Sequence, residues 1–353
     1  MCFSDPEFFM NKMGLVLQGG GALGAYEYGA VTRLIELQWQ PAVVTGVSIG
    51  AINAAAVAGA RNGDIRTSLE RIWDAITLPQ IPFWPADQQA VLSLWGNPRF
   101  YRVRTDVFNP LSQTNVYDLS PLRETLATIC DFDQLNDSSH VRISVTATDV
   151  TTGGQVSFSN YVASAGAHLR VIPKVRKGRI TPEHILASAS LPPGFPMTDI
   201  GDMRCWDGGL FDNTPIWALL DLLDEAEIDN LPIFVIELFP TRDSIPHNQK
   251  EVIERMIEIS YENRFWAEYE GAEGLSAFTD MLAAVARDLP ANSAVRSMEP
   301  FHRLQRLRAL KNLKVVPAAH VPMSGALDFS VHSVKARFDA GYAAIDKSLD
   351  TLS

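Results

Sequence analysis

Few cysteines, no long hydrophobic run and no excess of basic residues limit what this chain can be. Its three cysteines, Cys2, Cys130 and Cys205, are odd in number and widely spaced, so we expect neither a disulfide framework nor a CxxC metal site. The most apolar window, residues 51–60, is about half as long as a membrane-spanning helix. Any membrane contact is therefore expected to be peripheral, without a transmembrane segment.

The charge balance argues against nucleic acid as a partner. Thirty basic residues stand against 41 acidic ones, and the net charge of -11 repels phosphate backbones. Residues 1–12 lack an uninterrupted apolar segment, so no secretory signal is expected, and the cysteine usage fits a reducing, cytoplasmic setting. With 353 residues, 46% of them hydrophobic, the chain can bury a large core, but no oligomeric state is predicted.

Two strand–helix units begin the chain. Residues 14–18 indicate a short buried strand, followed by a glycine loop and an amphipathic helix. Residues 42–44 indicate a second strand, followed by a turn at 46–50 and a helix of small residues at 51–60. Successive units of this kind predict an α/β fold with a mostly parallel sheet covered by helices.

Later segments predict further elements. Ser120 followed by Pro121 predicts the N-cap and first residue of a helix that ends at Ile129. Strands at 141–148 and 155–159, joined by a glycine turn, add antiparallel pairing. The remaining expectations are a strand at 231–238, a helix at 249–266, a strand at 313–316 and a terminal helix at 334–349.

A serine lies in the turn between the second strand and its helix. The sequence Gly46-Val47-Ser48-Ile49-Gly50 fits the GxSxG pattern of a nucleophile elbow, in which flanking glycines allow the tight backbone that presents the hydroxyl. The following helix adds its N-terminal dipole near a developing oxyanion. The alternative is an ordinary strand-to-helix turn in which Ser48 only caps the helix.

The glycine loop after the first strand has two chemical interpretations. Gly19-Gly20-Gly21-Ala22-Leu23-Gly24 matches GxGxxG, the fingerprint of dinucleotide binding. That site needs an acidic residue at the end of the second strand, and residues 45–48 supply none. The same backbone N–H groups can instead stabilise an oxyanion, with Gly20 and Gly21 as first candidates. A glycine turn needed only for close packing is a third possibility.

The base that would activate Ser48 is either a late histidine or an aspartate. His247, His302, His320 and His332 follow late enough in the chain, but each is more typical of a surface or capping histidine. Asp207 precedes Gly208-Gly209, where glycines permit unusual dihedral angles and close approach. An aspartate with an ordinary pKa is a weak base, so it would need direct contact with Ser48.

Taken together, the motifs resemble those of the patatin-like phospholipase family. The three that match are the glycine loop at 19–24, the serine turn at 46–50 and the Asp-Gly-Gly sequence at 207–209. The run at 187–196 also resembles the segment that precedes the family's catalytic aspartate. The resemblance covers residues 13–215 and is typical of a bacterial-type member with a C-terminal extension.

The resemblance implies a three-layer α/β/α fold and a serine–aspartate dyad of Ser48 and Asp207, with no metal or cofactor. The implied oxyanion hole comprises Gly19, Gly20, Gly21, Leu23 and Gly24. Many members carry Arg or Lys where this chain has Leu23, which puts in doubt a preference for anionic headgroups close to the loop. The implied substrate is a lipid or another acyl ester.

The resulting hypothesis is a serine lipid-acyl hydrolase of the phospholipase A, lysophospholipase or esterase type. The alternatives are an acyltransferase that uses the same acyl-enzyme, a non-catalytic binding protein of the same fold and a dinucleotide-binding protein. Residues 13–215 are expected to form the catalytic core, and residues 216–353 a partly helical region that completes or extends the same domain.

The periodicity fails between residues 79 and 110, where we expect an ordered loop rich in proline and aromatic residues. These aromatic side chains either form a wall or lid for an acyl chain or simply pack in the core or on the surface. They are Phe83, Trp84, Trp95, Phe100, Tyr101 and Phe108.

Overall fold

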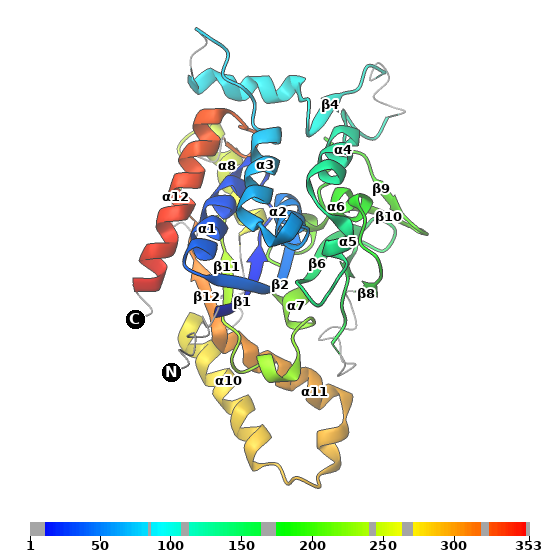
Figure 1. The fold of residues 1–353 in the computed structure, drawn as a ribbon, viewed down its shortest axis with the longest axis vertical. Helices are drawn as coiled ribbons and strands as arrows, with labels where there is room; N and C mark the ends of the chain where they lie inside the picture. The colour runs from blue at the N-terminus through cyan, green and yellow to red at the C-terminus, as the bar shows by residue number, and fades with distance from the viewer. Residues whose placement is uncertain are drawn as a thin grey trace, which may run out of the picture.

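A mixed β-sheet lies at the centre of the computed structural model (Figure 1). The structure describes residues 11–83, 86–106, 113–163, 174–239, 245–262, 271–318 and 325–350. Within them, nine strands form this sheet: β1 Asn11–Leu17, β2 Trp39–Val47, β6 Arg142–Asp149, β7 Gly154–Ser159, β8 Lys174–Lys177, β9 Thr198–Ile200, β10 Met203–Asp207, β11 Ile233–Ile236 and β12 Leu313–Val316. Strands β12, β11, β1, β2 and β6 are neighbours in that order, and all four pairings are parallel.

Helices cover both faces of the sheet, because its strands bury side chains on both sides. On β1, Met13, Leu15 and Leu17 pack into one hydrophobic cluster, whereas Val16 packs into another. The first cluster includes residues of α1 Ala25–Glu36, α2 Ile49–Ala58, α3 Ile65–Ile76, α4 Ser120–Ile129, α6 Pro182–Ser188 and α12 Val331–Asp350. The second includes residues of α7 Ile216–Leu220 and α10 Gly271–Asp288. The α/β class with a mostly parallel sheet is thus confirmed.

Most of the predicted elements are present within a few residues of their expected bounds, including β1, β2, α2, β6, β7, β11, β12 and α12. Helix α8 Gln249–Tyr261 ends before the predicted residue 266. The expected cap of α4 was wrong, because the helix begins at Ser120 with Leu119 as its N-cap. The backbone N–H and hydroxyl of Ser120 bind the carboxylate of Asp118, at 2.9 and 2.7 Å.

The aromatic stretch between residues 79 and 110 forms regular structure in part. It contains the 3₁₀ segment η3 Ala86–Trp95 and a small sheet of β3 Gly96–Asn97 and β4 Tyr101–Val103 with β5 Tyr117–Asp118. Phe100 and Tyr101 are buried and pack on Phe195, so these two side chains belong to the core. Phe83 and Trp95 are exposed. Trp84 and Phe108 lie outside the described residues.

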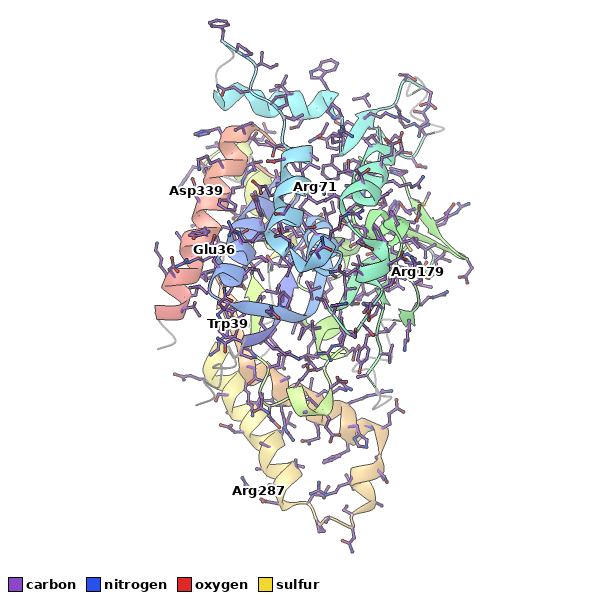
Figure 2. The ribbon with its side chains drawn as sticks, in the orientation of Figure 1. Glu36, Trp39, Arg71, Arg179, Arg287 and Asp339 are labelled. Carbon is purple, nitrogen blue, oxygen red and sulfur yellow. The ribbon has the colours of Figure 1, made fainter. Side chains whose placement is uncertain are left out.

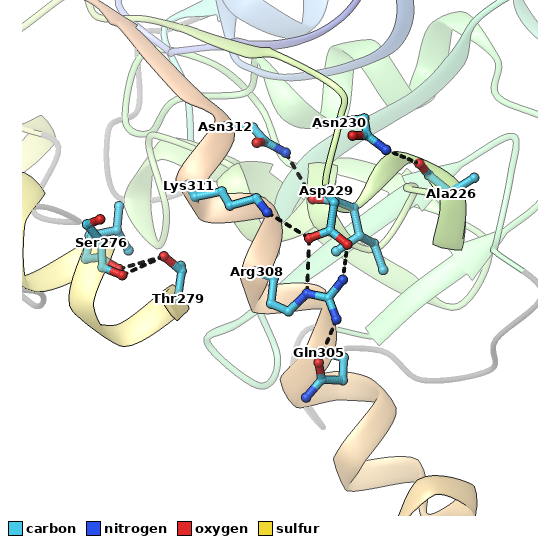
Figure 3. Close-up of polar contacts among 11 residues, drawn as sticks. Ala226, Asp229, Asn230, Ser276, Thr279, Gln305, Arg308, Lys311 and Asn312 are labelled. Atoms are coloured by element: carbon cyan, nitrogen blue, oxygen red, sulfur yellow. Dashed lines mark hydrogen bonds and ion pairs between the residues drawn. The ribbon is translucent and has the colours of Figure 1, made fainter. Parts of the chain in front are cut away.

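The C-terminal region adds strands to the sheet and a helical projection below it (Figure 1). The projection consists of α10, α11 Glu299–Arg306 and η7 Leu307–Asn312, with Arg287 near the far end of α10 (Figure 2). Asp229, which precedes β11, accepts hydrogen bonds from Arg308 and Lys311 of η7 (Figure 3). These ion pairs attach the projection to the sheet. Among the helices described, none is both long and apolar enough to cross a bilayer.

Candidate active site

The site lies where two strands meet end to end along one edge of β6. The first half of that edge pairs with β2, up to the pair Val47–Thr146. The second half pairs with β10, beginning at the pair Asp207–Ala147. Strand β7 occupies the opposite edge of β6. The end of β2 therefore meets the end of β10, and Ser48, the next residue after β2, comes close to Asp207.

Ser48 occupies a strained backbone conformation at the start of α2. Its φ of 54° and ψ of -123° are unusual for a residue with a side chain. The flanking glycines are required by space: a Cβ on Gly46 would lie 2.2 Å from the carbonyl oxygen of Gly50, and one on Gly50 would lie 2.4 Å from that of Leu17. The predicted tight turn is therefore present around Ser48, between Val47 and Ile49.

Two serines that the sequence did not single out fix the backbone at Ser48 and Asp207. The N–H of Ser48 donates to the carbonyl and hydroxyl oxygens of Ser188, at 3.1 and 3.0 Å. The Ser188 hydroxyl donates to the carbonyl of Thr146 at 2.6 Å. The N–H of Asp207 donates to the carbonyl of Ser190 at 3.0 Å. The run 187–196, which was noted from its resemblance alone, thus connects both residues.

Asp207 is a buried carboxyl group with one oxygen fixed. The residue is 2% exposed, and Oδ1 accepts a hydrogen bond from the N–H of Gly209 at 2.8 Å. Burial raises the pKa of Asp207 to about 7, although interactions with the Ser48 hydroxyl and the Gly209 N–H lower it. Oδ2 makes no well-directed hydrogen bond to the described residues. The carboxyl can therefore exchange a proton near neutral pH.

The glycines after Asp207 serve close approach rather than unusual dihedral angles. Neither Gly208 nor Gly209 has a positive φ, so that part of the expectation was wrong. A Cβ on Gly208 would lie 2.3 Å from the carbonyl oxygen of Thr146 and 2.7 Å from the side chain of Val47. Gly208 thus allows β10 to turn directly over the end of β2.

The glycine loop packs against the serine turn. A Cβ on Gly19 would lie 3.0 Å from the Cβ of Ser48, so the first and second motifs are in contact. Gly21 has φ of +57°, which glycine adopts without strain. Within the loop, the N–H of Leu23 donates to the carbonyl of Gly20 at 3.1 Å, and a Cβ on Gly24 would meet the Ile49 side chain at 2.6 Å.

Buried amide side chains join this loop to the Asp207 segment, and sequence patterns alone did not reveal them. Nε2 of Gln18 donates to the Thr214 hydroxyl at 2.6 Å, and Oε1 of Gln18 accepts from the N–H of Leu238 at 2.7 Å. Nδ2 of Asn213 donates to the carbonyls of Gly19 and Tyr261, both at 3.1 Å. A polar residue at the buried end of a strand, such as Gln18, was the available signal.

Apolar and aromatic side chains that follow β11 pack against the glycine loop. A Cβ on Gly20 would lie 2.9 Å from the Leu238 side chain and 3.4 Å from the Phe239 ring. Phe239 stacks on Tyr261, with ring centroids 5.7 Å apart. Burial raises the pKa of Tyr261, and so does the negative charge of Asp207. Tyr261 is therefore close to the Asp207 carboxylate.

The late histidines lie on the surface where the structure describes them. His247, His302 and His332 are exposed, and His320 lies outside the described residues. Among the described residues, no group of three or more His, Cys, Asp or Glu side chains could hold a metal ion.

The fold and the arrangement of the site define an α/β protein with a serine turn, a glycine loop and a buried carboxyl group in contact. The family model that matches the sequence is Patatin-like phospholipase, over residues 15–220. Because this match covers more than half of the chain, the chain belongs to the patatin-like phospholipase family. At the family level this makes it a lipid hydrolase. None of the curated proteins compared with the chain matches it.

Two solved structures are similar over most of this chain. VipD from Legionella pneumophila has 13% sequence identity and a TM-score of 0.39, over 96% of this chain and 67% of that one. A human GIVD cytosolic phospholipase A2, in complex with methyl gamma-linolenyl fluorophosphonate and terbium chloride, has 12% identity and a TM-score of 0.33, over 98% of this chain and 61% of that one. The chain thus spans less than two thirds of that phospholipase. These TM-scores are too low to support an argument, so the family assignment rests on the family match.

Proposed function

We propose that the protein is a serine lipid-acyl hydrolase of the phospholipase A, lysophospholipase or esterase type. Ser48 is the nucleophile, Asp207 is its general base, and the N–H groups of Gly20 and Gly21 stabilise the oxyanion. The observation that carries this proposal is the Asp207 carboxyl group, which is buried beside the Ser48 hydroxyl with a pKa of about 7.

The proposed reaction has two steps. The Ser48 oxygen attacks the ester carbonyl carbon while its proton moves to Asp207, and negative charge develops on the carbonyl oxygen. Collapse of this intermediate breaks the bond to the alcohol, which leaves with the proton from Asp207. Water then attacks the acyl-enzyme, Asp207 accepts its proton, and the fatty acid leaves as Ser48 regains a proton.

The environment of Asp207 suits this role. An ordinary aspartate is too weak a base at neutral pH, but a carboxylate with a pKa near the working pH accepts a proton more readily. The fixed Oδ1 orients the group and leaves Oδ2 for the serine hydroxyl. Catalytic hydrogen bonds often become well aligned only when substrate is bound.

We also propose that residues 13–215 form the catalytic core and that residues 216–353 complete the same domain. Strand β11 supports this, because it pairs with β1 over four residues beside the glycine loop. Leu238 and Phe239, which follow β11, lie against Gly20.

The test measures fatty acid released by the full chain from phosphatidylcholine and lysophosphatidylcholine vesicles, with and without glycerol as an acyl acceptor. Release by the wild type, with loss of about 10³-fold or more in Ser48→Ala and Asp207→Asn, supports the proposal. The control is Asp149→Asn, because Asp149 is also a buried aspartate but lies on β6, where its carboxylate accepts hydrogen bonds from Thr151 and Thr152. Equal activity of Ser48→Ala and the wild type would contradict the proposal, and a glyceride product would favour an acyltransferase.

A further inference from the structure

Residues of the C-terminal region bind both backbone polar groups of Ala22, which lies in the glycine loop. The N–H of Ala22 donates to the carbonyl of Ala326 at 2.8 Å. The carbonyl of Ala22 accepts from Nη1 of Arg337 at 3.4 Å, and the same Nη1 donates to the carbonyl of Asp328 at 2.9 Å. Arg337 therefore joins the glycine loop to the segment at 325–328.

This segment also contacts the loop directly. A Cβ on Gly21 would lie 2.3 Å from the carbonyl oxygen of Ala326, so the two backbones touch at the positive-φ glycine. The segment is anchored on its other side, because the carbonyl of Phe329 accepts from the N–H of Leu78 at 2.7 Å and the Phe329 ring packs on Trp73. The glycine loop therefore packs on a segment that is itself anchored to α3 and the residues after it.

Arg337 occupies a costly position for a charge. It lies on the inward face of α12, in register with the buried residues Val334, Gly341 and Ile345, and is only 2% exposed. Burial lowers its pKa, whereas the negative charge of Asp328 raises it. A buried cation is expensive unless its hydrogen bonds compensate for lost hydration. Its hydrogen-bond acceptors among the described residues are the two backbone carbonyls named above.

Helix α12 fixes where the guanidinium lies. It packs so closely on α1 that a Cβ on Gly29 would lie 2.0 Å from the Phe338 carbonyl oxygen, and one on Gly341 would lie 1.9 Å from that of Tyr26. Figure 2 marks Glu36 on α1 and Asp339 on α12, the two helices in contact. Because this contact is made by backbone, α12 has little freedom to move relative to the loop.

We infer that Arg337 is a positioning residue for the oxyanion-binding loop. Its guanidinium, together with Ala326, fixes the two peptide groups on either side of Ala22, directly after Gly20 and Gly21, so the N–H groups of those glycines keep their direction towards the reacting carbonyl. The inference rests on the proposed function. It assigns a catalytic contribution to a helix outside the 15–220 family match.

A second buried arginine provides a matched control. Arg306 is 3% exposed, and its Nη1 donates to the carbonyls of Leu220 and Leu223, at 3.0 and 2.7 Å. Burial lowers its pKa as it does that of Arg337. Arg306 binds carbonyls at and just after the end of α7 rather than the glycine loop, so its loss reports on stability alone.

A change at Gly325 tests the guanidinium without altering α12. A Cβ on Gly325 would lie 1.7 Å from Nη2 of Arg337, and Gly325 has no positive φ that would oppose substitution. Gly325→Ala therefore displaces the guanidinium, and it remains informative if Arg337→Met does not fold.

The experiment measures kcat and KM for p-nitrophenyl butyrate and the rate of inactivation by an alkyl fluorophosphonate, at a temperature below every unfolding transition. Arg337→Met and Gly325→Ala are each expected to reduce kcat and the inactivation rate about 10-fold or more, with KM changed less than about threefold. Arg337→Lys should recover part of the loss. The double variant should be no slower than the slower single variant.

Arg306→Met is expected to lower the unfolding temperature while kcat stays within about threefold of the wild type. If Arg337→Met and Gly325→Ala behave like Arg306→Met, the positioning role is wrong although the proposed function stands. A wild type that resists the fluorophosphonate and hydrolyses no ester would instead overturn the proposed function.

Discussion

Ser48 and Asp207 lie where two strands of opposite direction meet along the same edge of β6. Val47 pairs with Thr146, and Asp207 pairs with the next residue, Ala147. A parallel strand and an antiparallel strand thus share one edge, and their meeting point brings together residues 159 positions apart in the chain. The register of β6, rather than a long loop, sets the distance between them.

We expect activity to depend on deprotonation of Asp207. Its pKa of about 7 predicts that kcat/KM for an uncharged ester rises tenfold per pH unit below that value and levels off above it. A pH–rate profile of the wild type on p-nitrophenyl butyrate checks this. A profile that is flat from about pH 5 to pH 9 would contradict the assignment of Asp207 as the base.

The free energy of unfolding should also depend on the ionisation of Asp207, and the raised pKa fixes the direction of that dependence. The folded-state pKa of Asp207 is raised from 3.8 to about 7, so the stability this proton confers is present at low pH and is lost as pH rises through that range. Asp207→Asn has no such loss. Relative to the wild type, it should gain about 2–3 kcal/mol of unfolding free energy between pH 5 and pH 8, measured by urea unfolding.

Asp131 provides a control of opposite sign. Its side chain caps α5 Phe132–Leu135, and the N–H groups of Gln134 and Asp133 lower its pKa. Asp131→Asn should therefore gain no stability between pH 5 and pH 8. If Asp207→Asn also gains no stability over this pH range, the raised pKa of Asp207 is wrong.

Backbone strain at Ser48 predicts a difference between two inactive variants. Ser48→Gly should be more stable than Ser48→Ala by about 1 kcal/mol, because glycine adopts the positive φ of 54° without steric cost. Thermal unfolding of both variants at one pH measures the difference, and a less stable Ser48→Gly would show that the turn is unstrained.

The Ser188 hydroxyl should matter more for activity than that of Ser190. Both serines are fully buried, but the Ser188 hydroxyl contacts the N–H of Ser48, whereas that of Ser190 binds Leu186 and Thr198. Ser188→Ala is expected to lower kcat about 10-fold, and Ser190→Ala less than about threefold, with similar losses of stability. Equal kcat values for the two variants would remove Ser188 from the support of the nucleophile turn.

Local patterns predicted the elements that carry the motifs. Short apolar runs that end at a glycine turn, such as Leu15-Val16-Leu17 and Ala42-Val43-Val44, are typical of buried strands. They form β1 and β2. Strands β9 and β10 were missed because they are short and carry polar residues, such as Arg204, at exposed positions. Their pairing depends on β6, which is distant in the sequence.

The support of the site could not be predicted, because it is made by contacts between distant segments. Ser188, Gln18 and Asn213 bind backbone groups that become neighbours only after the sheet has formed. Arg337 left one signal in the sequence, a charged residue among the apolar positions of an amphipathic helix. That pattern indicates a buried charge but does not say which segment it contacts.

The central claim, that Ser48 is a nucleophile activated by Asp207, is tested most directly by covalent labelling. The full chain is incubated with an alkyl fluorophosphonate at about pH 8, and the adduct is located by intact mass and peptide mapping. We expect one adduct per chain on Ser48, none in Ser48→Ala, and labelling slowed by about 10³-fold in Asp207→Asn. An unlabelled wild type, or an adduct on any other residue, would contradict the account.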